Sequence, residues 1–216
     1  MPERFIIDVV SDVICPWCFL GKRRLDAALA RLDDLDVFVR WRPFMLDPTI
    51  PPEGLDRQDY MLAKFGPERL KTIHDPLIAA GEELGVPYDF EAITRTPNTL
   101  DAHRLIRWSH TVERQHETAE RLFMAYWSEG HDVGDRDVLA RCAGDVGINA
   151  AQIRELLDSD QDVLETRAEI QHATDIGVTG VPTFILAQSY ALVGAQSPEV
   201  LADAIARVAR ELAAEG

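Results

Sequence analysis

The sequence predicts an α/β protein in which a sheet-forming domain is interrupted by a helical one. Apolar, β-prone runs occur only toward the two ends of the chain, whereas a long middle section has apolar residues at helical spacing. We therefore expect the order strand–helix–strand, a helical block, and strand–strand–helix. The boundaries that follow are 1–48 and 177–216 for the sheet domain, with the helical insertion at 49–176.

The first part of the chain is typical of a βαβ unit. Residues 4–10 are rich in Phe, Ile and Val without clean alternation, which is expected of a strand covered on both faces. Apolar residues recur at helical spacing over 16–33, and Pro16 suits a first helical position, where no N–H is needed. The β-prone segment 37–44 then completes the unit.

Helical periodicity dominates from about residue 50 to residue 176, and sheet character returns after it. Apolar spacing, punctuated by glycines and prolines, predicts helices at 67–85, 100–115 and onward to 127, 136–146, 150–158 and 161–176. A strand is expected at 182–187, a hairpin at 188–189 and a short strand at 190–193. A last helix follows, since Ser197 suits an N-cap and Pro198 a first helical position.

Composition argues against two classes of function. The net charge of −15, from 37 acidic against 22 basic residues, repels a phosphate backbone, and no basic stripe with interleaved aromatic residues offsets it. No apolar run approaches the roughly 20 residues of a membrane span, and the N-terminus lacks the features of a signal peptide. We therefore expect a cytoplasmic protein without nucleic-acid or membrane partners, in a compartment where disulfides are more often catalytic than structural.

The motif Cys15-Pro16-Trp17-Cys18 carries the candidate chemistry, because two cysteines at this spacing can alternate between a dithiol and a disulfide. Cys15 is expected at the N-cap of the helix that begins at Pro16, where free backbone N–H groups and the helix dipole stabilise a thiolate. Cys18 lies one turn further on and is more shielded. We therefore expect Cys15 to attack a disulfide and Cys18 to resolve the mixed disulfide.

Two other interpretations of the cysteine pair stay open at this point. A structural zinc site needs four ligands, and neither Cys142 nor the histidines supply a second pair at ligand spacing. Two inert core thiols are disfavoured by the position of the pair between a strand and a helix, and Cys142 itself is expected to be a small buried hydrophobe. The histidines are His74, His103, His110, His116, His131 and His172.

The late segment 177–184, in which Pro182 opens a strand, completes a pattern that resembles the thioredoxin-fold superfamily. In that fold a C-x-x-C pair opens the first helix and faces a cis proline, and the central sheet is mixed. The large helical insertion resembles DsbA-type oxidoreductases, while segments 11–18 and 194–198 look like the FrnE-like cytoplasmic branch. The resemblance covers essentially the whole chain and implies a thioredoxin-like fold with an all-helical insertion domain.

The resemblance also implies roles for individual residues. It implies Cys15 as the nucleophile, Cys18 as the resolving thiol and Pro182 as the cis proline beside them. Val181 would offer its backbone groups to an extended peptide, as in strand addition. The candidate substrate-binding residues are Pro16, Trp17, Val181 and Asn98.

Three positions qualify the resemblance. Trp17 stands where DsbA proteins usually have a histidine, so their redox potential does not transfer. In the related hydroxychromene-carboxylate isomerases and kappa-class glutathione transferases, a serine stands at the position of Cys15. The segment around Asn98 resembles a glutathione-binding segment of that branch, and the alternative for Asn98 is a helix cap. Asp8, a carboxylate in an apolar strand, is a candidate acceptor for the Cys18 proton, the alternative being a solvated or hydrogen-bonded strand end.

The function expected from the sequence is thiol–disulfide exchange with protein or small-molecule disulfides through Cys15 and Cys18. No metal and no cofactor other than the redox-active pair is expected, and glutathione is a candidate co-substrate. One alternative is a glutathione-dependent transferase or isomerase of the hydroxychromene-carboxylate isomerase or kappa type. A second is a non-enzymatic or zinc-binding module.

Overall fold

The centre of the molecule is a four-stranded mixed sheet. A computed structural model of the chain describes residues 4–32 and 34–215. The strand order is β2-β1-β5-β6, in which β1 pairs parallel to β2 and antiparallel to β5, and β5 pairs antiparallel to β6. The strands are β1 (Phe5–Ser11), β2 (Val37–Pro43), β5 (Thr183–Leu186) and β6 (Tyr190–Val193). The thioredoxin-like α/β fold expected from the sequence is therefore confirmed.

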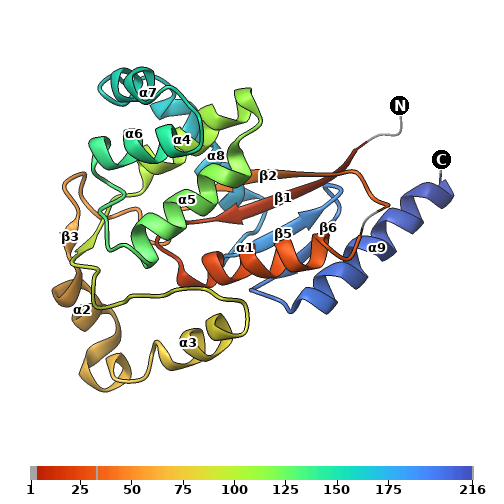
Figure 1. Cartoon of the computed structure of the whole chain (residues 1–216), viewed down its shortest axis with the longest axis horizontal. Coiled ribbons are helices and arrows are strands. Elements are labelled where there is room, and N and C mark those ends of the chain that lie inside the picture. The colour runs from red at the N-terminus through yellow and green to blue at the C-terminus, as the bar shows by residue number, and fades with distance from the viewer. Residues whose placement is uncertain (1–3, 33, 216) are drawn as a thin grey trace.

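Helices cover this sheet and extend beyond one end of it. In Figure 1, α1 and α9 lie together along the sheet, and α4 to α7 gather toward the end at which β1 stops and α1 starts. Helix α8 packs against β2. The helices are α1 (Pro16–Leu29), α2 (Arg57–Leu70), α3 (Asp75–Glu82), α4 (Leu100–Ser109), α5 (Gln115–Trp127), α6 (Arg136–Asp145), α7 (Ala150–Leu157), α8 (Val163–Asp175) and α9 (Pro198–Glu215), with a 3-10 turn η1 (His110–Val112).

The two faces of β1 explain its uninterrupted apolar run. Ile7 and Val9 belong to the main core, which also contains buried residues of α1, α5 and α9. Val10 instead joins a smaller cluster with Ala173 of α8. Because both faces are covered, β1 lacks the alternation of a half-exposed strand, and its carboxyl end is held rigidly where the cysteine motif begins.

The predicted helices differ from the observed ones mainly around residue 66. The prediction began a helix at 67, whereas α2 already begins at Arg57 and runs through a break at Gly66, which has a φ of 75°. Gly66-Pro67 marks an interruption inside the segment and was interpreted as its start. The insertion is also not wholly helical, because β3 (Leu55–Asp56) and β4 (Arg95–Thr96) form a two-residue antiparallel ladder.

The proposed domain boundaries stay predictions. Residues 1–3 and 216 of the predicted sheet domain, and residue 33 at the end of the helix predicted at 16–33, lie outside the described residues. Within the described part of the chain, no helix combines the length and apolar character needed to cross a membrane.

Candidate active site

Cys15 occupies the N-cap position of α1, as the sequence predicted. Its backbone is extended, with φ −97° and ψ 112°, and Pro16 takes the first helical position. The Cys15 carbonyl accepts hydrogen bonds from the backbone N–H groups of Cys18 at 3.0 Å and Phe19 at 3.4 Å. The Cys15 sulfur therefore sits at the positive end of the helix dipole, where an anion is stabilised.

Val181 and Pro182 form the opposite wall of the site. The peptide bond between them is cis, and the Cys15 thiol lies 3.6 Å from the Val181 carbonyl oxygen, to which it donates. Gly21 makes the close approach of α1 possible, because a Cβ at this position would lie 2.8 Å from the Pro182 Cγ. Residues about 165 positions apart in the chain are thus brought into direct contact, in the arrangement that the resemblance implied.

Cys18 is the more buried member of a pair in which both side chains are buried, Cys15 having 4% of its surface exposed. All three cysteines are free thiols, and only 1% of the Cys18 surface is exposed. Burial raises the pKa of Cys18 well above its ordinary value, and the neighbouring Cys15 raises it further, while hydrogen bonds from the Ser11 side chain and the Asp12 backbone act in the opposite direction. Cys18 is therefore a protonated thiol at neutral pH.

Two aromatic residues that sequence reasoning missed fix the segment around the cysteines. The Tyr88 hydroxyl donates to the Pro16 carbonyl at 2.7 Å, and the Trp127 indole N–H donates to the Val13 carbonyl at 2.9 Å. Burial, followed by the two neighbouring cysteines, raises the pKa of Tyr88, which keeps the hydroxyl a donor. No local pattern marks either residue, since Tyr88 lies in a loop and Trp127 ends a helix.

Trp17 is the exposed side chain of the motif, with 39% of its surface accessible. Pro16 beside it is partly buried, and its carbonyl is already occupied by Tyr88. An accessible indole next to Cys15 offers an apolar surface to an incoming substrate. The substrate-binding roles of Pro16 and Trp17 stay predictions.

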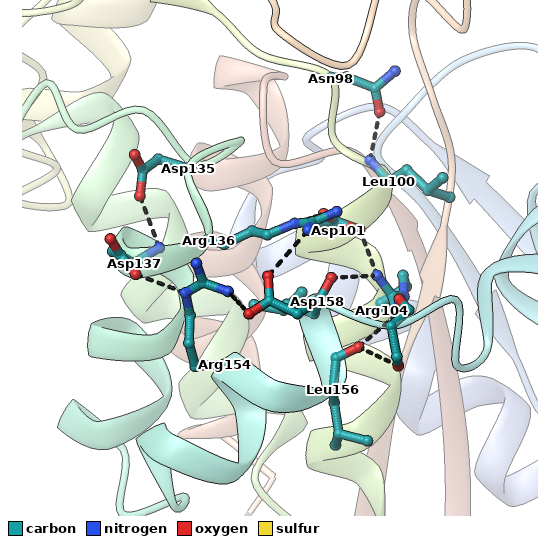
Figure 2. A network of polar contacts seen from close by, with 12 residues as sticks. Asn98, Leu100, Asp101, Arg104, Asp135, Arg136, Asp137, Arg154, Leu156 and Asp158 are labelled. Carbon is teal, nitrogen blue, oxygen red and sulfur yellow. Dashed lines mark hydrogen bonds and ion pairs between the residues drawn. The ribbon is translucent and has the colours of Figure 1, made fainter.

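Asn98 lies at the start of α4 and is fully engaged there. Its side-chain amide donates to the Ile50 carbonyl at 2.6 Å and its oxygen accepts from the Leu100 N–H at 3.0 Å. Figure 2 shows this contact beside a larger polar network that joins α4 to α6 and α7. These bonds match the helix-cap alternative, and a ligand role for Asn98 stays a prediction.

The same network anchors α4 through Arg104, a fully buried side chain. Its guanidinium donates to Asp101 at 2.7 Å and to the carbonyls of Leu156 at 2.8 Å and Ser159 at 2.7 Å (Figure 2 shows the side of the network around Leu156). Hydrogen bonds from a charged donor to several carbonyls hold it tightly. These bonds hold α4 in place, and with it the neighbouring residue His103, which lies against Asp12.

Asp8 is not brought to the cysteines. Its carboxylate accepts two hydrogen bonds from Arg40, at 2.8 and 2.7 Å, and one from Arg42 at 2.8 Å. Its register partners across the sheet are Arg40 and Ile185. These contacts match the alternative interpretation of Asp8 as a hydrogen-bonded strand residue. Its role as a proton acceptor stays a prediction, and no contact with the cysteines supports it.

Neither the third cysteine nor the histidines assemble with the motif into a metal site. Cys142 is buried in α6, and burial raises its pKa to about 11. Among the residues that the structure describes, no group of three or more His, Cys, Asp or Glu side chains gathers as metal ligands.

Comparison with known proteins agrees with this geometry. The model of the DSBA-like thioredoxin domain family matches residues 6–206. The chain belongs to this family. A Bacillus subtilis (strain 168) protein, YwbO, is 31% identical over 202 residues, which cover 92% of this chain and 94% of that protein. Among solved structures, the probable DsbA oxidoreductase SCO1869 from Streptomyces coelicolor matches with a TM-score of 0.85 and 29% identity, over 94% of this chain and 89% of the other.

A solved structure of lower sequence identity shows a likeness of fold alone. The cytosolic disulfide reductase DsbM from Pseudomonas aeruginosa, solved with GSH, has a TM-score of 0.64 and 18% identity, over 96% of this chain and 98% of its own. The DsbA assignment expected from the sequence is thus confirmed, and the protein belongs to a family of thioredoxin-fold oxidoreductases.

Proposed function

We propose that this protein is a thiol–disulfide oxidoreductase that acts on protein or small-molecule disulfides through Cys15 and Cys18. The observation that carries the proposal is the asymmetry of the pair. Cys15 lies at the N-terminus of α1 against the Val181 carbonyl, whereas Cys18 is buried one turn further along and has a raised pKa. One sulfur is placed to meet a substrate, and the other is kept as a thiol until it is needed.

The reaction proceeds in two exchanges. The Cys15 thiolate attacks a substrate disulfide, forms a mixed disulfide and releases the first substrate thiolate. Cys18 then attacks the Cys15 sulfur, forms the Cys15–Cys18 disulfide and releases the second, so that the substrate is reduced and the enzyme oxidised. The reverse sequence oxidises a dithiol substrate, and the direction depends on the reduction potential of the pair relative to its redox partner.

Trapping of the mixed disulfide tests the proposal. A Cys18→Ser variant in a Cys142→Ala background should accumulate one covalent adduct with a peptide disulfide, located at Cys15 by mass spectrometry. The matched Cys15→Ser variant should accumulate none at Cys18, because the raised pKa of this thiol keeps it protonated. Absence of an adduct on Cys15 would contradict the proposal.

Glutathione is a candidate co-substrate, which the GSH in the DsbM structure supports for a protein of the same fold. A glutathione-dependent transferase or isomerase is the alternative activity. In the related isomerases and kappa-class transferases a serine stands at the position of Cys15, so with this activity a Cys15→Ser variant would keep activity on electrophilic or chromene-type substrates. Loss of all exchange activity in Cys15→Ser supports the oxidoreductase.

A further inference from the structure

The resolving step of the proposed function raises a proton problem. Cys18 must lose its proton before it can attack, yet only 1% of its surface is exposed and burial raises its pKa well above the ordinary value. Besides Cys15, whose sulfur is bound in the mixed disulfide at this step, the groups that act on it are the Ser11 side chain and the Asp12 backbone. Neither of these groups is a base, so the proton has to travel further.

A buried carboxylate and a histidine lie together behind the motif. Asp12 is completely buried and directly follows β1, and its Oδ2 accepts from the Leu46 N–H at 2.8 Å. Its Oδ1 lies 3.5 Å from the Nε2 atom of His103, which is itself 4% exposed. The backbone carbonyl of Asp12 accepts from the Cys15 N–H at 3.0 Å, so the same residue shapes the turn into the active site.

The surroundings of His103 define its proton-bearing atom. Nε2 lies 2.9 Å from the Phe44 carbonyl oxygen, which can only accept, so Nε2 carries a hydrogen and donates it there. Nδ1 makes no hydrogen bond to any residue that the structure describes and is the atom with the free lone pair in the neutral ring. No lysine or arginine of the described chain is ion-paired with Asp12, so His103 is its cationic partner when the ring is charged.

A cavity links this pair to the hydroxyl beside Cys18. It has a volume of about 270 Å³, and its lining includes Ser11, His103 and Gln115. Both polar and apolar side chains line this space, which is large enough for several water molecules. Ser11 therefore has Cys18 on one side and the cavity on the other.

We propose that His103, held by Asp12, takes up the proton that leaves Cys18 in the resolving step, with Ser11 and cavity water as the path. The Ser11 hydroxyl receives the Cys18 proton and passes its own to water, which protonates Nδ1 of His103. The Cys18 thiolate attacks Cys15 and forms the disulfide, and the substrate thiolate leaves. Asp12 stabilises the resulting imidazolium from the Nε2 side. His103 thus accepts the proton, and Asp12 is the residue that positions His103.

This inference rests on the proposed function. Other charged side chains line the same cavity, so the test needs a control at one of them. The charged and titratable side chains that line the same cavity come from β2, α4, η1 and α8 with its N-cap. They are Arg40, Arg42, Arg107, His110, Asp162 and Glu169. His110 is exposed and serves as the control histidine.

The two exchanges can be followed separately with dithiobis(nitrobenzoic acid) in a stopped-flow spectrometer. The first coloured thiolate reports attack by Cys15, and the second reports resolution by Cys18. In a Cys142→Ala background, His103→Gln should slow the second phase about 10- to 100-fold and leave the first phase within twofold, while His110→Gln changes neither. Asp12→Asn should slow the second phase as well, because the imidazolium loses its partner.

The pH profile separates proton uptake from a structural effect. The rate of the second phase in the wild-type protein should depend on pH in a way that His103→Gln loses and His110→Gln keeps. If His103→Gln has a normal first phase and a second phase unchanged in rate and pH profile, this inference alone is overturned. If the wild-type protein shows no first phase, the proposed function is overturned as well. If neither the Asp12 nor the His103 variant folds, a wild-type second phase whose rate does not change with pH would overturn the inference.

Discussion

Gly21 is the point at which α1 comes closest to the wall of the active site. An ideal Cβ built on it would lie 2.8 Å from the Cγ of Pro182 and 3.3 Å from the ring of Phe184. The first distance is shorter than carbon atoms tolerate, and neither the proline ring nor the buried phenylalanine is a flexible chain end. A Gly21→Ala substitution must therefore push α1 and Pro182 apart by a few tenths of an ångström.

Two opposing free energies set the size of the effect. Alanine in a helix is favoured over glycine by about 0.8–1.0 kcal/mol, and one extra carbon in a packed core costs about 1–3 kcal/mol. Gly144 of α6 provides the matched control, because its Cβ would meet only the Cβ of Ala150 at an ordinary 3.5 Å. The overlap cost should therefore appear as a difference of about 1–3 kcal/mol between Gly21→Ala and Gly144→Ala.

Urea unfolding of the two reduced variants and the wild-type protein measures this difference directly. Gly144→Ala should be as stable as the wild type or up to about 1 kcal/mol more stable, and Gly21→Ala should be the least stable of the three. Stopped-flow exchange should also show a slower first phase in Gly21→Ala, because Val181 moves relative to the Cys15 sulfur. A Gly21→Ala protein as stable as Gly144→Ala, with unchanged exchange, would refute the packing argument.

Three further predictions concern other parts of the site. Tyr88→Phe leaves the Pro16 carbonyl without its 2.7 Å donor and should lower the free energy of unfolding by about 1 kcal/mol, with faster alkylation of the cysteines as the readout. Asp8→Asn removes the negative charge and the Oδ2 acceptor of Arg40, keeps one oxygen for the other two arginine hydrogen bonds, and should cost about 1.5–3 kcal/mol in urea unfolding without slowing the resolving phase; a slowed phase at unchanged stability would restore Asp8 as proton acceptor. Burial raises the pKa of Asp26, but the His116 hydrogen bond and neighbouring charge outweigh it, so the net pKa lies below 3.8. This stabilisation is present above the ordinary value and is lost as pH falls below about 4, so acid unfolding of Asp26→Asn should depend less steeply on pH in that range.

The sequence predicted the parts of the site that local patterns encode. Pro16 after Cys15 marked the helix start, and the N-cap position of Cys15 followed from it and is confirmed. The thioredoxin-like sheet followed from apolar runs at the two ends of the chain. The start of α2 was wrong because Gly66-Pro67, which looks like a helix boundary, interrupts a segment that continues on both sides.

The contacts that orient the motif could not be predicted, because they join residues far apart in sequence. Trp127 donates to Val13 across 114 positions, and Tyr88 reaches Pro16 across 72. The sequence marked His103 only as one of six histidines without a ligand partner, and nothing local indicates that Asp12 lies against it. Only the folded arrangement distinguishes such a histidine from an ordinary core residue.

The helical insertion therefore supplies more than a cover for the sheet. Three of its residues contact the short segment from Ser11 to Pro16. They are Tyr88, Trp127 and His103. The segments around β1, α1 and β5 provide the two cysteines and Val181, whereas Tyr88, Trp127 and His103 contact the segment that leads into the cysteines. Apart from burial, the groups that act on the Cys18 pKa are Cys15, Ser11 and Asp12, and the helical segment between β2 and β5 acts on Cys18 through its contacts with Asp12, Val13 and Pro16. Substitution of His103, which contacts Asp12, should for that reason change the resolving exchange more than the first attack.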